Sequence, residues 1–86
     1  MSNCKKGEVW CTHKGHQCFY IFDVVGGRPL SHGIDLMDAE VFNDDYNWLF
    51  SRPALEEEKR EFYETLDRYG LVIDLNRKKI RRKYNF

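Results

Sequence analysis

One stretch, residues 51–70, constrains the fold of this 86-residue chain more than any other. It reads SRPALEEEKREFYETLDRYG, and four of its apolar residues recur at spacings of seven, four and three. These residues are Leu55, Phe62, Leu66 and Tyr69. Such spacing places them on one stripe of an α-helix, so the stretch predicts an amphipathic helix with this stripe facing a core.

Both ends of the predicted helix carry the usual signals. Ser51 can act as the N-cap, because its hydroxyl can accept a hydrogen bond from an orphan backbone N–H, and Pro53 suits a first turn. The acidic run Glu56–Glu58 lies near the positive end of the helix dipole, and Arg68 lies near the negative end. Gly70 supplies the left-handed residue that commonly ends a helix.

The first part of the chain predicts strands. Residues 8–13 and 16–25 indicate a hairpin around the turn Lys14-Gly15, and the second of these strands, HQCFYIFDVV, is nearly continuous in apolar character. A strand of this kind is expected to be central and buried on both faces. Residues 26–29, rich in glycine, end it. Residues 1–7 are expected to form a loose, basic lead-in, and residues 30–35 are compatible with a loop that contains an extended piece.

Residues 36–50 predict a second helix. Four residues with helical spacing carry this interpretation, namely Ala39, Phe42, Tyr46 and Leu49. The run Asn43, Asp44, Asp45 competes for backbone hydrogen bonds, so Asn43 is where such a helix would break.

Beyond Gly70, residues 71–75 predict a strand, residues 76–78 a turn, and the basic tail, residues 76–86, a returning hairpin strand. The predicted fold is therefore a single α+β domain spanning residues 1–86, in the order β-β-α-α-β-β. Its strands are expected to form one mostly antiparallel sheet packed against two helices.

Charge is strongly segregated although the formal net charge is zero. Residues 35–67 carry eleven acids against three bases, whereas residues 76–86 carry six bases and no acid. This separation predicts polar surfaces for partners. No apolar run approaches the roughly 18 residues of a membrane span, and the N-terminus lacks a signal-peptide h-region. The three cysteines fit reduced thiols better than a disulfide framework, so a cytoplasmic location is expected.

The first hairpin carries a candidate zinc site. If Lys14-Gly15 is a two-residue turn, Cys11 lies across from Cys18 and His13 across from His16, and all four side chains share one face. Thiolate and imidazole are ligands that zinc prefers, but one flat hairpin face converges poorly on a tetrahedron. The interpretation of the cysteines as small core residues is therefore favoured over zinc. A Cys11–Cys18 disulfide is not expected in a cytosolic protein.

The basic tail offers a nucleic-acid surface, since Lys and Arg beside aromatic residues can neutralise phosphates and stack on bases. The residues of this alternative are Arg77, Lys78, Lys79, Arg81, Arg82 and Lys83. It would make the protein a nucleic-acid-binding regulator or a small ribonuclease. A charged edge strand is the structural interpretation of the same pattern.

The leading prediction is a small, non-enzymatic, cytosolic protein that binds and modulates, and in the sharper version inhibits, a larger protein partner. An origin in a phage or mobile element would suit such a protein. The predicted partner-binding residues combine acids with aromatic anchors and are Asp44, Asp45, Tyr46, Trp48, Glu56 and Glu57. No catalytic residue is predicted, because no motif places a nucleophile beside a base. Homodimerisation through the C-terminal edge strand is compatible with so thin a core.

Overall fold

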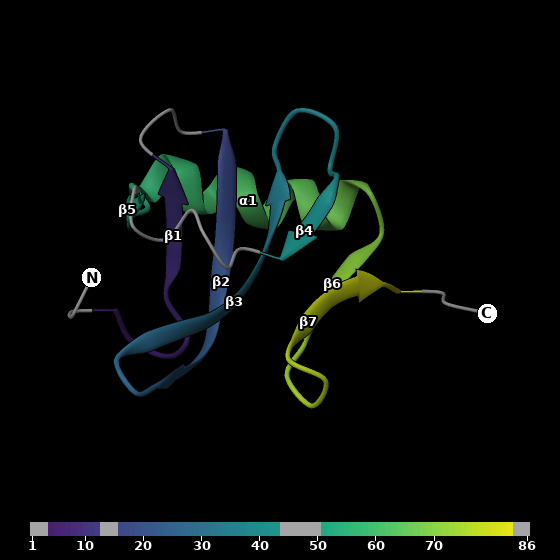
Figure 1. Ribbon diagram of the computed structural model, residues 1–86. Helices are drawn as coiled ribbons and strands as arrows, with labels where there is room; N and C mark the ends of the chain where they lie inside the picture. Colours follow the sequence, from purple (N-terminus) through teal and green to yellow (C-terminus); the bar gives the residue numbers. More distant parts are fainter. Residues whose placement is uncertain (1–3, 13–15, 44–50, 84–86) are drawn as a thin grey trace.

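An antiparallel sheet with a helix across one face forms the body of the protein (Figure 1). The computed structural model describes residues 4–12, 16–43 and 51–83. The elements of these residues are β1 (Val9–Thr12), β2 (Gln17–Val25), β3 (Arg28–Asp35), β4 (Val41–Asn43), β5 (Ser51–Pro53), α1 (Glu56–Arg68), β6 (Leu71–Asp74) and β7 (Lys79–Arg82).

The strands form two sheets and not the single sheet that the sequence predicts. Five strands pair in the order β4-β3-β2-β1-β5, and β6 pairs with β7 in a separate hairpin. Every pair is antiparallel, as expected. In Figure 1 the hairpin stands beside the five-stranded sheet, next to β4. The order of the predicted N-terminal and C-terminal strand pairs is confirmed, and Cys11 lies opposite Cys18 in the predicted register.

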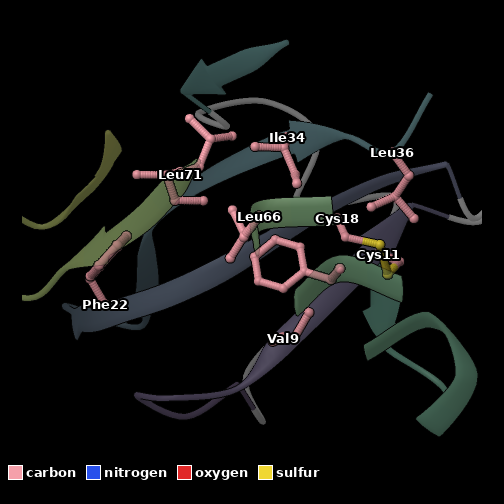
Figure 2. Close-up of a cluster of buried hydrophobic side chains, with 10 residues drawn as sticks. Val9, Cys11, Cys18, Phe22, Ile34, Leu36, Leu66 and Leu71 are labelled. Atoms are coloured by element: carbon pink, nitrogen blue, oxygen red, sulfur yellow. A yellow bond between two sulfur atoms is a disulfide. The ribbon is translucent and has the colours of Figure 1, made fainter. Parts of the chain in front are cut away.

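The main core lies between the sheet and α1. Phe62 and Leu66 of the helix pack against residues of β1, β2 and β3, together with Leu71 and Ile80 of the C-terminal hairpin. Figure 2 shows this cluster, with the Cys11–Cys18 disulfide at one end and Leu71 at the other. Since the hairpin contributes to this core, the molecule is one packed unit around α1.

The opposite face of the sheet is also buried. There Phe19 and Ile21 of β2 form a second cluster with Trp10, and Cys4 packs into it although it lies in the segment expected to be loose. Because Cys18 and the other alternate residues of β2 face the helix, the prediction that this strand is buried on both faces is confirmed.

The predicted start of the helix is wrong. Ser51–Pro53 forms the edge strand β5, in which Pro53 lies opposite Trp10, and a proline is tolerated there because an edge strand need not donate every N–H. The helix begins at Glu56, with Leu55 as N-cap. The predicted acidic first turn, the basic Arg68 in the last turn and the left-handed Gly70, with φ of 68°, are confirmed.

A carboxylate replaces the expected serine cap. Both oxygens of Glu58 accept from the guanidinium of Arg52, at 2.6 and 2.8 Å, and one of them also accepts the Leu55 N–H at 2.8 Å. The side chain of Leu55 has no oxygen with which to complete a capping box, so the box is formed from the Glu58 side only, and the same carboxylate joins Arg52 of β5 to the helix. The Arg52 guanidinium lowers the pKa of Glu58 below its ordinary value.

The predicted second helix is wrong over its described part, because residues 36–43 form a turn and then β4. Two aspartates cause the reversal. The carboxylate of Asp35 accepts the Met37 N–H at 2.8 Å, and that of Asp38 accepts the Glu40 N–H at 2.9 Å. Between these bonds Ala39 adopts a left-handed φ of 60°, which a helix does not allow. Residues 44–50 of the predicted helix lie outside the described residues.

Candidate functional site

A groove of about 660 Å³ lies where the β3–β4 turn, the end of α1 and the β6–β7 hairpin meet. It is lined by Asp38, Ala39, Glu40, Val41, Tyr69, Gly70, Leu71, Ile80, Arg81 and Arg82. Ligand sites in proteins usually measure roughly 300–1,000 Å³. The groove therefore has the size of a binding site, and it takes residues from three separate parts of the chain.

One wall of the groove is the edge strand β4. In the five-stranded sheet β4 stands at the end, with β3 as its neighbour. Gly33 of β3 lets the two strands approach, because a Cβ at this position would lie 2.8 Å from the ring of Phe42 and 2.6 Å from the carbonyl oxygen of Cys18. The ring of Phe42 therefore crosses directly over Gly33 and fixes β4 against β3.

The hydrogen-bond pattern shows which backbone groups of β4 face outward. Asp35 donates its N–H to the Glu40 carbonyl at 3.0 Å, so residues 35 and 40 are a hydrogen-bonded pair. Such pairs alternate along an antiparallel ladder, which makes Gly33 and Phe42 the next one. Val41, between them, directs its own N–H and C=O away from β3. These two groups lie on the outer edge of the sheet, with which no strand of residues 4–12, 16–43 or 51–83 pairs.

The other wall is the β6–β7 hairpin, which a buried hydrogen bond fastens to β3. Ile80 donates its N–H to Nδ1 of His32 at 2.8 Å, while the Lys83 N–H donates to the carbonyl of Gly70 at 2.7 Å and so extends the ladder of the hairpin itself. Burial, together with the nearby Lys79 ammonium, lowers the pKa of His32 below its ordinary value of 6.5. A lowered pKa favours the neutral ring, whose Nδ1 can accept the Ile80 N–H.

The charges around the groove are not equally available. The Arg81 guanidinium donates to the Asp74 carboxylate at 2.7 Å, and this contact lowers the pKa of Asp74. Arg82 is exposed and has no ion-pair partner within the described ranges. On the opposite wall, the carboxylate of Glu40 is exposed, whereas that of Asp38 already accepts a backbone N–H. As far as the described residues go, Arg82 is therefore the cation of the groove that is available to an anion.

Two of the segments that line the groove also carry exposed apolar side chains. Met37 is 78% exposed at the β3–β4 turn, and Tyr69 is 49% exposed at the end of the helix, where the sequence predicts a buried position. Leu55, at the other end of the predicted stripe, is also exposed. Of the four stripe residues, the prediction therefore places Phe62 and Leu66 correctly in the core. Tyrosine, methionine and arginine are enriched in the cores of protein interfaces.

The predicted partner-binding residues are only partly within the described residues. Asp44, Asp45, Tyr46 and Trp48 lie outside them. Glu56 and Glu57 are exposed in the first turn of α1, at the end of the helix that is remote from Tyr69 and the groove. These two glutamates are thus not part of the groove.

The predicted basic surface is partly neutralised. Arg77 and Arg81 face Asp74 at 3.9 and 2.7 Å, and Lys78 lies 3.3 Å from the Asp23 carboxylate. The N–H of Val24 and the Lys78 ammonium lower the pKa of Asp23. The remaining three residues, Lys79, Arg82 and Lys83, are exposed without an ion-pair partner in the described part of the chain.

The residues of the predicted zinc site take a different form. Cys11 and Cys18 are joined by a disulfide and are both 0% exposed, so the expectation of reduced thiols is wrong for this pair. Their facing positions explain the bond. His16 is exposed, and His13 lies outside the described residues. Among residues 4–12, 16–43 and 51–83, no three His, Cys, Asp or Glu side chains come together as a metal site. Zinc binding stays a prediction, and it requires the reduced protein.

Comparison with protein-family models, with curated proteins and with solved structures gives no match. Within the described ranges, no helix has the length and apolar character needed to cross a membrane. The site is therefore interpreted from its own geometry.

Sequence reasoning missed most of the groove. The sequence predicts that Asp38, Glu40 and Val41 lie in a helix over residues 36–50, and that Tyr69 lies on the buried stripe of the helix over residues 51–70. One signal was present, since two aspartates three residues apart, Asp35 and Asp38, favour consecutive turns through their carboxylates. Arg81 and Arg82 were identified as candidates, but for a nucleic-acid surface.

Proposed function

We propose that this protein is a small, non-enzymatic binding protein that docks on a larger protein and modulates it through the groove beside β4. The observation that carries this proposal is the outer edge of β4, unpaired among the described strands, next to an exposed tyrosine. Val41 directs an N–H and a C=O outward, and Tyr69 lies on the same groove with half of its surface exposed. Unpaired strand edges are templates for pairing with another chain, and tyrosines often anchor interfaces.

The distribution of charge favours a protein over a nucleic acid. A polyanion binds best to a continuous stripe of uncompensated bases. Here three of the six basic residues of the tail face carboxylates, and the groove carries Glu40 opposite Arg82. A rim with both signs suits a polar protein surface better than a phosphate backbone.

Affinity capture with the immobilised full chain, from cells that encode it, tests the proposal. A captured protein would be purified, and its Kd measured against the wild type, Tyr69→Ala and the matched control Tyr63→Ala. Tyr63 is 44% exposed on the middle of α1, outside the groove lining. Loss of an interface tyrosine is expected to weaken binding about tenfold or more, and the control to change it little.

Two results would overturn the proposal. One is equal binding by the Tyr69 and Tyr63 variants to every captured protein. The other is tight binding of generic DNA or RNA that falls steeply with salt and is abolished by Lys79→Glu, a residue outside the groove lining.

A further inference from the structure

We infer that the groove takes a single extended segment of its partner, which adds as a strand to the outer edge of β4 and places a carboxylate on Arg82. This inference rests on the proposed function and specifies both the binding mode and the chemistry of the segment. It follows from the backbone of β4, the shape of the groove and the charges on its walls.

The backbone of β4 is prepared for strand addition. The hydrogen-bonded pair of Gly33 and Phe42 uses the inner groups of the strand, which leaves the N–H and C=O of Val41 pointing outward. In the part of the chain that the structure describes, no strand pairs with this outer edge. An extended peptide that exchanges two hydrogen bonds with Val41 would continue the ladder.

The shape of the groove favours a single extended segment of a partner over a broad, flat partner surface. The β6–β7 hairpin forms a second wall opposite β4, and it is held in place by the bond from Ile80 to His32 and by the burial of Leu71 and Ile80 in the main core. A volume of about 660 Å³ between two walls suits a narrow ligand, whereas a folded sheet edge would meet the hairpin. A partner's extended segment therefore fits this site better than a second copy of the chain.

The charges select the segment's chemistry. Arg81 is already paired with Asp74, so its guanidinium mainly stabilises the hairpin. The guanidinium of Arg82 lacks a carboxylate partner within the described residues and lines the groove. A guanidinium can hold a carboxylate through two parallel hydrogen bonds, which favours an acidic side chain in the segment.

The test uses the full oxidised chain and a displayed library of random peptides of about six residues, the usual length of a strand. Selected peptides would be synthesised with an N-methyl group at each position in turn. Strand addition predicts that N-methylation at alternate positions abolishes binding, while the intervening positions tolerate it, because only alternate N–H groups face β4. It also predicts an acidic position in the selected sequences.

Variants of the protein test the charge. Arg82→Glu is expected to weaken the selected peptide about tenfold or more, and replacing the acidic residue of the peptide by lysine should restore binding to this variant. Arg60→Glu, at an exposed arginine of α1 outside the groove lining, is the matched control and should bind as the wild type does.

Each outcome decides the inference separately from the proposed function. Peptides that bind without a period-two effect of N-methylation, or with equal affinity for Arg82→Glu, would overturn strand addition. A chain that forms dimers through β4 and selects no peptide would also overturn it. If a folded partner is captured and its binding depends on Tyr69, the proposed function holds even when one of these results overturns strand addition.

Discussion

Mild acid is expected to loosen the β6–β7 hairpin from the five-stranded sheet. Nδ1 of His32 accepts the N–H of Ile80 at 2.8 Å, and Ile80 is only 2% exposed. Protonation places a hydrogen on Nδ1, so that two donors face each other and the bond is lost. The hairpin carries Ile80, Arg81 and Arg82 into the groove, and the wall of the binding site would loosen with it.

The sign of the effect follows from the lowered pKa of His32 in the folded protein. The unfolded chain, with its histidine near the ordinary value of 6.5, then takes up the proton first. Neutral His32 therefore makes its full contribution to the free energy of unfolding above the pKa of the unfolded chain. This contribution is lost as the pH falls below that pKa, until His32 is protonated in the folded state as well. Leaving a buried N–H without its acceptor costs about 1–3 kcal/mol. In a domain of this size each kcal/mol corresponds to a fall in Tm of about 4–8 °C.

Thermal unfolding between about pH 7.5 and pH 5, above the range in which most carboxylates titrate, measures the effect. The Ile80 amide resonance should move together with the titration of His32. His32→Asn keeps an oxygen acceptor near Nδ1 and cannot titrate, so its Tm should depend less on pH. His16→Gln, at an exposed position, is the control and should keep the wild-type dependence. An unchanged pH dependence in His32→Asn would refute the reasoning.

Three further changes test how the fold supports the site. Glu58→Ala removes the bonds from Arg52 and Leu55 and should lower the free energy of unfolding by about 1–3 kcal/mol in a denaturant titration, with a smaller effect from its exposed neighbour in Glu57→Ala. Replacing glycine by alanine normally stabilises a strand, but in Gly33→Ala the new Cβ would meet the Cys18 carbonyl oxygen at 2.6 Å. The free energy of unfolding is therefore expected to fall by about 1–3 kcal/mol in the same denaturant titration, and a rise would contradict the packing of β4. Reduction of the disulfide should lower stability by about 2–4 kcal/mol, seen as a fall in Tm that the Cys11→Ser, Cys18→Ser double variant no longer shows on adding reductant.

The parts of the fold that the sequence predicts correctly are those with a strong local pattern. Continuous apolar character places β2 in the centre of the sheet, and the register predicted for the first hairpin, with Cys11 opposite Cys18, is the one observed. Phe62 and Leu66 are buried at helical spacing, and Gly70 ends the helix region with positive φ. In these places, periodicity and backbone preference agree with the tertiary fold.

The errors occur where a short-range bond or an edge position decides the conformation. The spacing of Ala39 and Phe42 fits a helix, but the carboxylates of Asp35 and Asp38 accept N–H groups of the turn and reverse the chain. Pro53 fits a first helical turn and equally an edge strand, and pairing of β5 with β1 decides between them. Neither outcome follows from periodicity, since the first depends on local side-chain bonds and the second on pairing with a distant strand.

The candidate site was largely beyond sequence reasoning for the same physical reason. It is formed by three segments that meet only in the folded protein. The outward direction of the Val41 N–H and C=O depends on the pairing of β4 with β3, which the identity of the residue does not reveal. The tail was predicted as one basic surface, yet Asp74 and Asp23 neutralise part of it. The composition of the tail alone does not predict which of its bases pair with carboxylates elsewhere in the fold.

Amide hydrogen exchange in the presence of a saturating partner tests the central claim most directly. If a partner adds to the free edge of β4, exchange of the Val41 N–H should slow markedly, whereas the Phe42 N–H, already paired with β3, should change little. Protection confined to the first turn of α1, around Glu57, or to the basic turn around Lys78, with no change at Val41, would contradict it.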